Sequence, residues 1–146
     1  MKKLFPMLWA LLAPLFLAAV EPPKGWVTDV AAARELAKKE NLPVLVLFSG
    51  TDWCPPCKTL RRDVLDTPEF QEMIAKKCVA LYIHVPVRAD ENFSRTMKNF
   101  PFVEIRGVPT IIVTDPEIGK TIGRVYRRSV EGFAGALDDA AGKIAR

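Results

Sequence analysis

Hydrophobic positions along the chain occur both at helical spacing and in short unbroken runs. Apolar residues recur at helical spacing up to about residue 40, and an unbroken apolar run follows over residues 44–48. Such a run is typical of a strand buried on both faces of a sheet. Helices are expected over residues 29–40, 54–65 and 89–99, and two more are expected to begin at residues 67 and 129. Strands are expected over residues 44–48, 78–85, 110–114 and 121–127. This order predicts one α/β domain, with a mixed central sheet of about four strands and helices on both faces.

The N-terminal segment has a different pattern from the rest of the chain. Two lysines precede an uncharged run over residues 4–20, as in the positive start and apolar core of a secretory signal. Two prolines interrupt the run, which weakens it as a permanent anchor. We therefore expect a signal peptide over residues 1–19, cleaved near Ala19 or Val20, with an uncleaved anchor as the alternative. Residues 20–146 then form a single domain with a short N-terminal lead-in, exported to a periplasm or another oxidising space.

Charge and cysteine content exclude several classes of protein. The formal net charge of +4 falls to +2 once Lys2 and Lys3 are removed with the signal, so nucleic acid is not an expected partner. Three cysteines in 146 residues are too few for a disulfide scaffold. With the signal cleaved, no stable membrane span is expected.

The candidate chemistry lies at Cys54 and Cys57, at the start of the helix predicted over residues 54–65. The two residues are one helical turn apart, close enough to form a small disulfide ring. Free backbone N–H groups and the helix dipole favour negative charge at Cys54, which makes it the expected nucleophile. Cys57, one turn further in, is more shielded and is expected to resolve the mixed disulfide.

Neighbouring residues shape this reactivity. Pro55 and Pro56 suit the first helical turn, because their missing N–H groups would be unpaired there. They leave only the N–H groups of Cys57 and Lys58 as donors to a Cys54 thiolate, so its stabilisation is expected to be moderate. An inert structural disulfide is the alternative, although a ring within one turn adds little stability.

Two other uses of the cysteines fit the sequence poorly. A c-type haem attachment needs His directly after the second cysteine, where this chain has Lys58. A zinc site would require Cys78 and His84 to join Cys54 and Cys57, yet six residues along one strand span about 20 Å. We therefore expect no metal and no bound cofactor.

The remaining candidates have ordinary structural interpretations. Cys78 lies on a predicted buried strand, where a free cysteine usually acts as a small hydrophobe. A reactive third thiol is the alternative. His84, the only histidine, is expected at the surface or at the strand end rather than as a catalytic base. Arg124, Arg127 and Arg128 are expected to form a solvated strand edge.

Three features together resemble the thioredoxin-like thiol–disulfide oxidoreductases. They are the apolar strand over residues 44–48, the WCPPCK segment over residues 53–58, and the IRGVPT segment over residues 105–110. Within the family, residues 52–70 resemble most the C-terminal domain of the bacterial transmembrane disulfide-interchange reductase, and small exported relatives of that domain. The resemblance covers about residues 26–146.

The resemblance implies roles for several residues. Pro109 would follow a cis peptide bond and, with Val108, form a ledge where substrate backbone pairs beside the disulfide. Trp53 would place its ring beside the nucleophile, with core packing as the alternative. The family's buried acid, which helps to deprotonate the inner cysteine, would fall near Leu47 or Phe48, and neither of these can titrate.

These features predict an exported thiol–disulfide oxidoreductase that exchanges disulfides with protein substrates. A redox partner protein would renew the pair formed by Cys54 and Cys57. Proline at both central positions offers few donors to a thiolate, which favours the reductase direction. A non-enzymatic thioredoxin-fold module that binds proteins and keeps a structural disulfide is the alternative.

Overall fold

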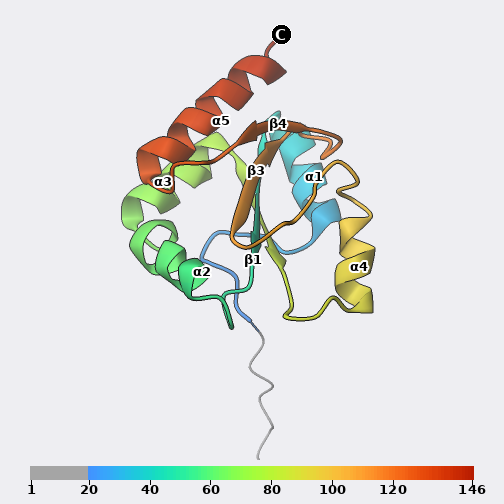
Figure 1. The fold of residues 1–146 in the computed structure, drawn as a ribbon. Coiled ribbons are helices and arrows are strands. Elements are labelled where there is room, and N and C mark those ends of the chain that lie inside the picture. Colours follow the sequence, from blue (N-terminus) through green and yellow to red (C-terminus); the bar gives the residue numbers. More distant parts are fainter. Residues whose placement is uncertain (1–19) are drawn as a thin grey trace, which may run out of the picture.

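The computed structural model describes residues 20–146, so the signal peptide expected over residues 1–19 lies outside the described residues. A four-stranded sheet in the order β2-β1-β3-β4 forms its centre (Figure 1). The strands are β1 (Val44–Ser49), β2 (Val79–His84), β3 (Thr110–Thr114) and β4 (Thr121–Arg124). The helices are α1 (Val30–Glu40), α2 (Pro55–Leu60), the π-helix η1 (Arg61–Leu65), α3 (Pro68–Lys77), α4 (Glu91–Met97) and α5 (Val130–Ile144). β1 pairs parallel with β2 and antiparallel with β3, which confirms the predicted mixed sheet.

Strand β1 lies at the centre of the sheet and is buried along its whole length. Leu45 and Leu47 face one hydrophobic cluster, while Val46 and Phe48 face the other. The unbroken apolar run is therefore buried on both faces, as predicted.

Helices cover both faces of the sheet (Figure 1). On one face α2, η1, α3 and α5 contribute Leu60, Leu65, Phe70 and Phe133, in that order, to the cluster that contains Leu47. On the other face α1 contributes Ala33, and α4 packs partly buried side chains against the same cluster. The two clusters bury both faces of the sheet, in which the end of β1 lies beside the start of β3.

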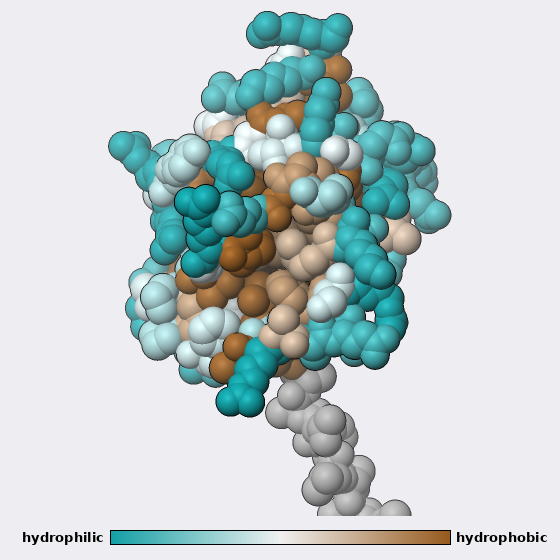
Figure 2. All heavy atoms as spheres, turned by 45° about the vertical axis from the view of Figure 1, so that its right-hand side comes forward, coloured by the Kyte–Doolittle hydropathy of each residue, from teal (hydrophilic) through white to brown (hydrophobic). Residues whose placement is uncertain are grey.

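The segment between α4 and β3 stays partly exposed. Phe102, Val103 and Ile105 pack against the cluster on the α1 side without being fully buried. Figure 2, which brings the side with α4 forward, shows hydrophobic side chains gathered in the middle of this face and hydrophilic ones around them. This segment leads directly to Val108 and Pro109.

Some boundaries differ from those predicted. β4 ends at Arg124 instead of residue 127, and only the N–H of Val125 continues the pairing, to the carbonyl of Ile111 at 3.3 Å. In the register of β3 and β4, Pro109 would face Arg127, and its missing N–H cannot extend the ladder as far as residue 127. The helix expected over residues 89–99 is shorter, since the Asp90 side chain caps α4 by accepting the N–H of Phe93 at 2.7 Å.

The helix expected over residues 54–65 changes geometry halfway. Its second half is the π-helix η1, where the N–H of Asp66 bonds to the carbonyl of Arg61. Val64 and Leu65 are both buried there. A wider turn of this kind occurs often beside functional sites and has no clear signal in the hydrophobic pattern.

The lead-in before α1 also contributes to the sheet. Val27 forms an isolated parallel bridge with Leu81, beyond the edge formed by β2. Trp26 next to it is buried and stacks on Phe70, with ring centroids 6.3 Å apart.

No helix within residues 20–146 has the length and apolar character needed to cross a membrane.

Candidate active site

Cys54 and Cys57 form a disulfide immediately after β1, at the start of α2. Their Cα atoms are 5.3 Å apart, within the usual range for a disulfide. Cys54 is 3% exposed and Cys57 1% exposed, so in the disulfide form the two differ little in shielding.

Cys54 occupies the N-cap position of α2, and the backbone N–H of Cys57 donates to its Sγ atom at 3.2 Å. The N–H of Lys58, the second expected donor, bonds instead to the backbone carbonyl of Cys54 at 3.1 Å. Pro55 and Pro56 fill the first two helical positions and donate nothing. A single backbone N–H therefore reaches the Cys54 sulfur, one fewer than the sequence suggested.

A loop far along the chain lies against this disulfide. The Val108–Pro109 peptide bond is cis, as the resemblance implies, and Pro109 is buried just before β3. The carbonyl oxygen of Val108 lies 3.7 Å from the Sγ atom of Cys54. The antiparallel pairing of Phe48 with Thr110 makes this possible, because it places the end of β1 beside the start of β3.

Trp53 lies at the rim of the site and is 40% exposed, so it is not a core residue. Its indole Nε1–H donates to the carbonyl of Val85 at 2.8 Å. The ring packs so closely on Gly50 that a Cβ atom there would overlap it. The N–H groups of Trp53 and Cys54 both donate to the Gly50 carbonyl, which closes the turn before the disulfide.

Three hydroxyl groups form a chain behind this turn. The Thr51 Oγ1 atom is 3.0 Å from Ser49 Oγ and 3.2 Å from the Tyr82 hydroxyl, which also donates to the Ser49 carbonyl at 3.4 Å. Ser49 and Tyr82 are both buried. From the sequence, the alternation of side chains along the strands could have predicted that Ser49 and Tyr82 share one face of the sheet. Their contact with Thr51 had no such signal, because it depends on the conformation of the loop.

Acidic groups stay at the surface of the described part of the chain. Within residues 20–146 the buried polar side chains are Ser49 and Thr114, and no carboxylate is buried. Asp52 is exposed and lies 3.8 Å from Nδ1 of His84, which ends β2 and is half-buried. His84 is thus a strand-end residue, as predicted.

Cys78 is a free buried thiol, which confirms its interpretation as a small hydrophobe. Burial raises the pKa of this thiol to about 12. The pairing of Val44 with Val79 places Cys78 beside the start of β1, at the opposite end of the strand from Cys54. Five strand residues separate these ends by roughly 17 Å, too far for a disulfide.

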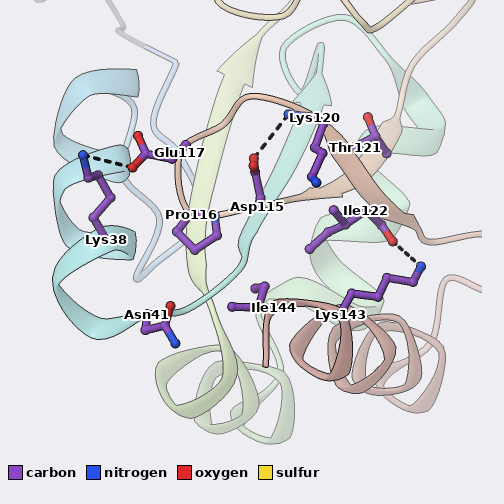
Figure 3. Close-up of a pocket in the computed structure, with 10 residues that line it drawn as sticks. All are labelled: Lys38, Asn41, Asp115, Pro116, Glu117, Lys120, Thr121, Ile122, Lys143 and Ile144. Atoms are coloured by element: carbon purple, nitrogen blue, oxygen red, sulfur yellow. Dashed lines mark hydrogen bonds and ion pairs between the residues drawn. The ribbon is translucent and has the colours of Figure 1, made fainter. Parts of the chain in front are cut away.

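A hollow of about 780 Å³ also lies at that opposite end of the sheet (Figure 3). Its charged groups are largely satisfied internally. Lys38 pairs with Glu117 at 3.0 Å, and Lys143 donates to the Ile122 carbonyl at 2.5 Å. No cysteine lines it, so the candidate active site remains at the disulfide.

The fold and the disulfide together define the class of thioredoxin-like thiol–disulfide oxidoreductases. A family model described as thioredoxin-like matches residues 25–116. The chain therefore belongs to the thioredoxin-like family.

Two curated relatives come from Chlamydia pneumoniae. The thioredoxin-related protein DsbJ is 40% identical over 58 residues, which cover 40% of this chain and 17% of DsbJ. The disulfide bond reductase DsbH is 24% identical over 98 residues, which cover 65% of this chain and 58% of DsbH. The chain thus spans less than two thirds of the length of each of these relatives.

Solved structures share the fold at low sequence identity. A DsbH oxidoreductase matches with a TM-score of 0.63 at 18% identity, covering 86% of this chain and 92% of that one. The oxidised DsbD C-terminal domain of Neisseria meningitidis matches with a TM-score of 0.56 at 19% identity, covering 76% of this chain and 98% of that one. Both likenesses establish the thioredoxin-like architecture.

Proposed function

We propose that this chain is an exported thiol–disulfide oxidoreductase that works in the reducing direction on protein disulfides. The observation that carries the proposal is the Cys54–Cys57 disulfide at the helix start, with the Val108 carbonyl oxygen 3.7 Å from Cys54 Sγ. A disulfide in this position closes almost no loop, so exchange chemistry accounts for it better than stabilisation does.

The reaction begins with the reduced protein. The Cys54 thiolate attacks one sulfur of the substrate disulfide, and the other substrate sulfur leaves as a thiolate that takes up a proton. Cys57 then loses its proton and attacks Cys54 Sγ, which forms the Cys54–Cys57 disulfide and releases the second substrate thiol. The substrate gains two electrons, which a redox partner protein with a dithiol must resupply. The electrons reside in the cysteine pair, so the reaction needs no bound cofactor.

Neighbouring residues position the substrate in this proposal. Val108 and Pro109 form the ledge along which substrate backbone lies, and Trp53 covers the side of the turn next to Cys54. Pro55 and Pro56 limit the donors to the Cys54 thiolate, and the exposed Lys58 adds positive charge nearby. The resulting modest thiolate stabilisation supports the reductase direction. The relative named disulfide bond reductase agrees with this direction.

Export is part of the proposal and rests on the sequence pattern of residues 1–19. A positive start followed by an uncharged apolar run, with cleavage near Ala19 or Val20, would deliver residues 20–146 to a periplasm. A dedicated reductant would then have to keep Cys54 and Cys57 in the dithiol form against oxidising surroundings.

Trapping of the intermediate tests the proposal. A Cys57→Ser variant of the full chain, expressed in a bacterium and acid-quenched, should accumulate mixed disulfides linked through Cys54. These should disappear on reduction and should be absent from a Cys54→Ser variant of equal abundance. Failure of Cys57→Ser to trap any Cys54-linked partner would rule the proposed exchange out.

A binding module with a structural disulfide is the second candidate. It is favoured by the burial of Cys54 and Cys57, which are no more than 3% exposed in the disulfide form. Under this candidate a Cys54→Ser/Cys57→Ser variant keeps its binding to unfolded protein, and the wild type reduces no insulin. Reduction of insulin by the wild type, but not by the double variant, would exclude the binding module.

A further inference from the structure

Two hollows lie close to the disulfide, one against the first turn of α2 and one against Pro109. The first, of about 450 Å³, is lined mainly by apolar side chains, including Pro55, Pro56 and Leu60 of α2. The second, of about 210 Å³, lies beyond Pro109 along the end of β4. Arg128 lines both hollows, so a chain that crosses the disulfide would pass this residue.

The segment that carries Arg128 is fixed in place. The buried side chain of Val125 holds one end, and the Ser129 hydroxyl caps α5 by accepting the N–H of Gly132 at 3.3 Å. A Cβ atom at Gly132 would overlap the carbonyl of Arg127, so α5 packs directly on this backbone. The exposed side chains of the segment therefore project from a rigid base.

The surface presented here is positive and aromatic. Arg124 and Arg128 are exposed, and neither takes part in an ion pair within residues 20–146. Tyr126 between them is 86% exposed. We call Arg124, Tyr126 and Arg128 the arginine ledge.

Nearby acids do not neutralise the arginine ledge. Asp63, which lines the first hollow, is engaged by Arg62 through hydrogen bonds of 2.5 and 2.9 Å. The pKa of Glu131 is lowered mainly by hydrogen bonds at the start of α5, and also by the charge of Arg127. Neither Asp63 nor Glu131 forms an ion pair with Arg124 or Arg128, so both guanidinium groups can meet an external carboxylate.

We propose that the arginine ledge selects disulfide substrates whose reacting cysteine lies in an extended, acidic segment. This inference rests on the proposed function and adds the chemistry of its substrate. The substrate backbone crosses Val108 and Pro109, and Asp or Glu side chains close to its cysteine meet Arg124 and Arg128. Guanidinium groups suit this role because they hold carboxylates through paired hydrogen bonds.

The expected effect is on the rate of encounter more than on the chemical step. Exposed charge pairs contribute little static affinity, but complementary charges accelerate association and lose this effect in salt. We expect an acidic substrate to react about three to ten times faster than a neutral one at low ionic strength. The difference should shrink as salt shortens the range of the charges.

Short synthetic peptides test the inference. Each contains one cysteine, flanked on both sides by Glu, by Gln or by Lys, and carries it as a 2-pyridyl disulfide. The reduced protein is mixed with each peptide, and release of pyridine-2-thione gives the second-order rate constant at low and high salt. The Glu peptide should react fastest and the Lys peptide slowest, with the spread reduced at high salt.

Variants connect this preference to the arginine ledge. In Arg124→Gln/Arg128→Gln the ratio of Glu to Gln peptide rates should fall close to one. Lys39→Gln/Lys120→Gln removes the same charge at the opposite end of the sheet and should keep the wild-type ratio. Equal rates for all three peptides with the wild type, or loss of the preference in the lysine control, would overturn the inference. If no peptide reacts at all, the proposed function itself fails.

Discussion

The Sγ atom of Cys54 lies 3.7 Å from the carbonyl oxygen of Val108, 54 residues further along the chain. The contact depends on the register of β1 and β3, in which Phe48 faces Thr110. A shift by one residue would turn every buried side chain of β3 to the other face, so the hydrophobic core fixes the active-site geometry.

Gly50→Ala should displace Trp53. The added methyl group would overlap the indole ring, so the hydrogen bond from Trp53 to the Val85 carbonyl should break. We expect a loss of about 1–3 kcal/mol in the free energy of unfolding and a change in tryptophan fluorescence. Chemical denaturation of the oxidised protein measures the first, and an emission spectrum measures the second.

Gly135→Ala is the matched control for this substitution. Its position in α5 has no atom within 4 Å of a new Cβ, so the same chemical change should be neutral or slightly stabilising. Equal effects of Gly50→Ala and Gly135→Ala would contradict the close packing of Trp53 on Gly50.

Tyr82→Phe should loosen the turn that precedes the disulfide. It removes the hydroxyl that bonds to the Ser49 carbonyl and lies within 3.2 Å of Thr51 Oγ1. We expect a cost of about 1 kcal/mol in the free energy of unfolding and faster amide hydrogen exchange in the turn. Tyr126→Phe, at an exposed side chain, should leave both measurements unchanged.

Cys78 should resist thiol reagents while the protein is folded. In the oxidised protein it is the one free thiol of the chain, and it is only 6% exposed. We expect no reaction with Ellman's reagent at pH 8 until denaturant is added, and then one equivalent. Rapid labelling of the native protein would instead support the reactive third thiol considered from the sequence.

The raised pKa of Cys78 also predicts a pH dependence of stability. Its thiol has a pKa of about 12 in the folded protein against an ordinary value of 9.0, so the unfolded chain loses this proton first. Stability should therefore fall as pH rises above about 9, by up to about 1.4 kcal/mol per pH unit, relative to a Cys78→Ala variant. Parallel curves for both proteins between pH 9 and 11 would contradict the burial of this thiol.

Much of the fold could be predicted because hydrophobic patterning and turn residues determine it locally. The buried strand β1 and the chain order of helices and strands both followed from such signals. The end of β4 and the π-helix η1 could not, since they depend on which partner atoms the rest of the fold supplies. Val27 extends the sheet for the same reason, through pairing that its own neighbours do not reveal.

The candidate site divides in a similar way. The positions of Cys54 and Cys57 follow from their spacing at a helix start, whereas the link to Val108 came only through resemblance to a family. The hydroxyl contact between Thr51 and Tyr82 carried no sequence signal, because it joins a loop to a strand far along the chain. The number of donors to Cys54 Sγ was overestimated, since the Lys58 N–H bonds to the backbone carbonyl of Cys54 instead.

A redox titration of the cysteine pair is the most direct test of the proposal that the disulfide is a reagent. The protein is equilibrated in thiol–disulfide buffers of graded potential, and the fraction of reduced Cys54 and Cys57 is counted by alkylation and mass spectrometry. We predict one reversible two-electron transition between roughly −200 and −300 mV, on the reducing side of the family's range, with the protein folded throughout. A cysteine pair that cannot be reduced without unfolding the protein would contradict the proposed reductase activity. A reduction potential of about −120 mV, as in strong oxidants, would also contradict it.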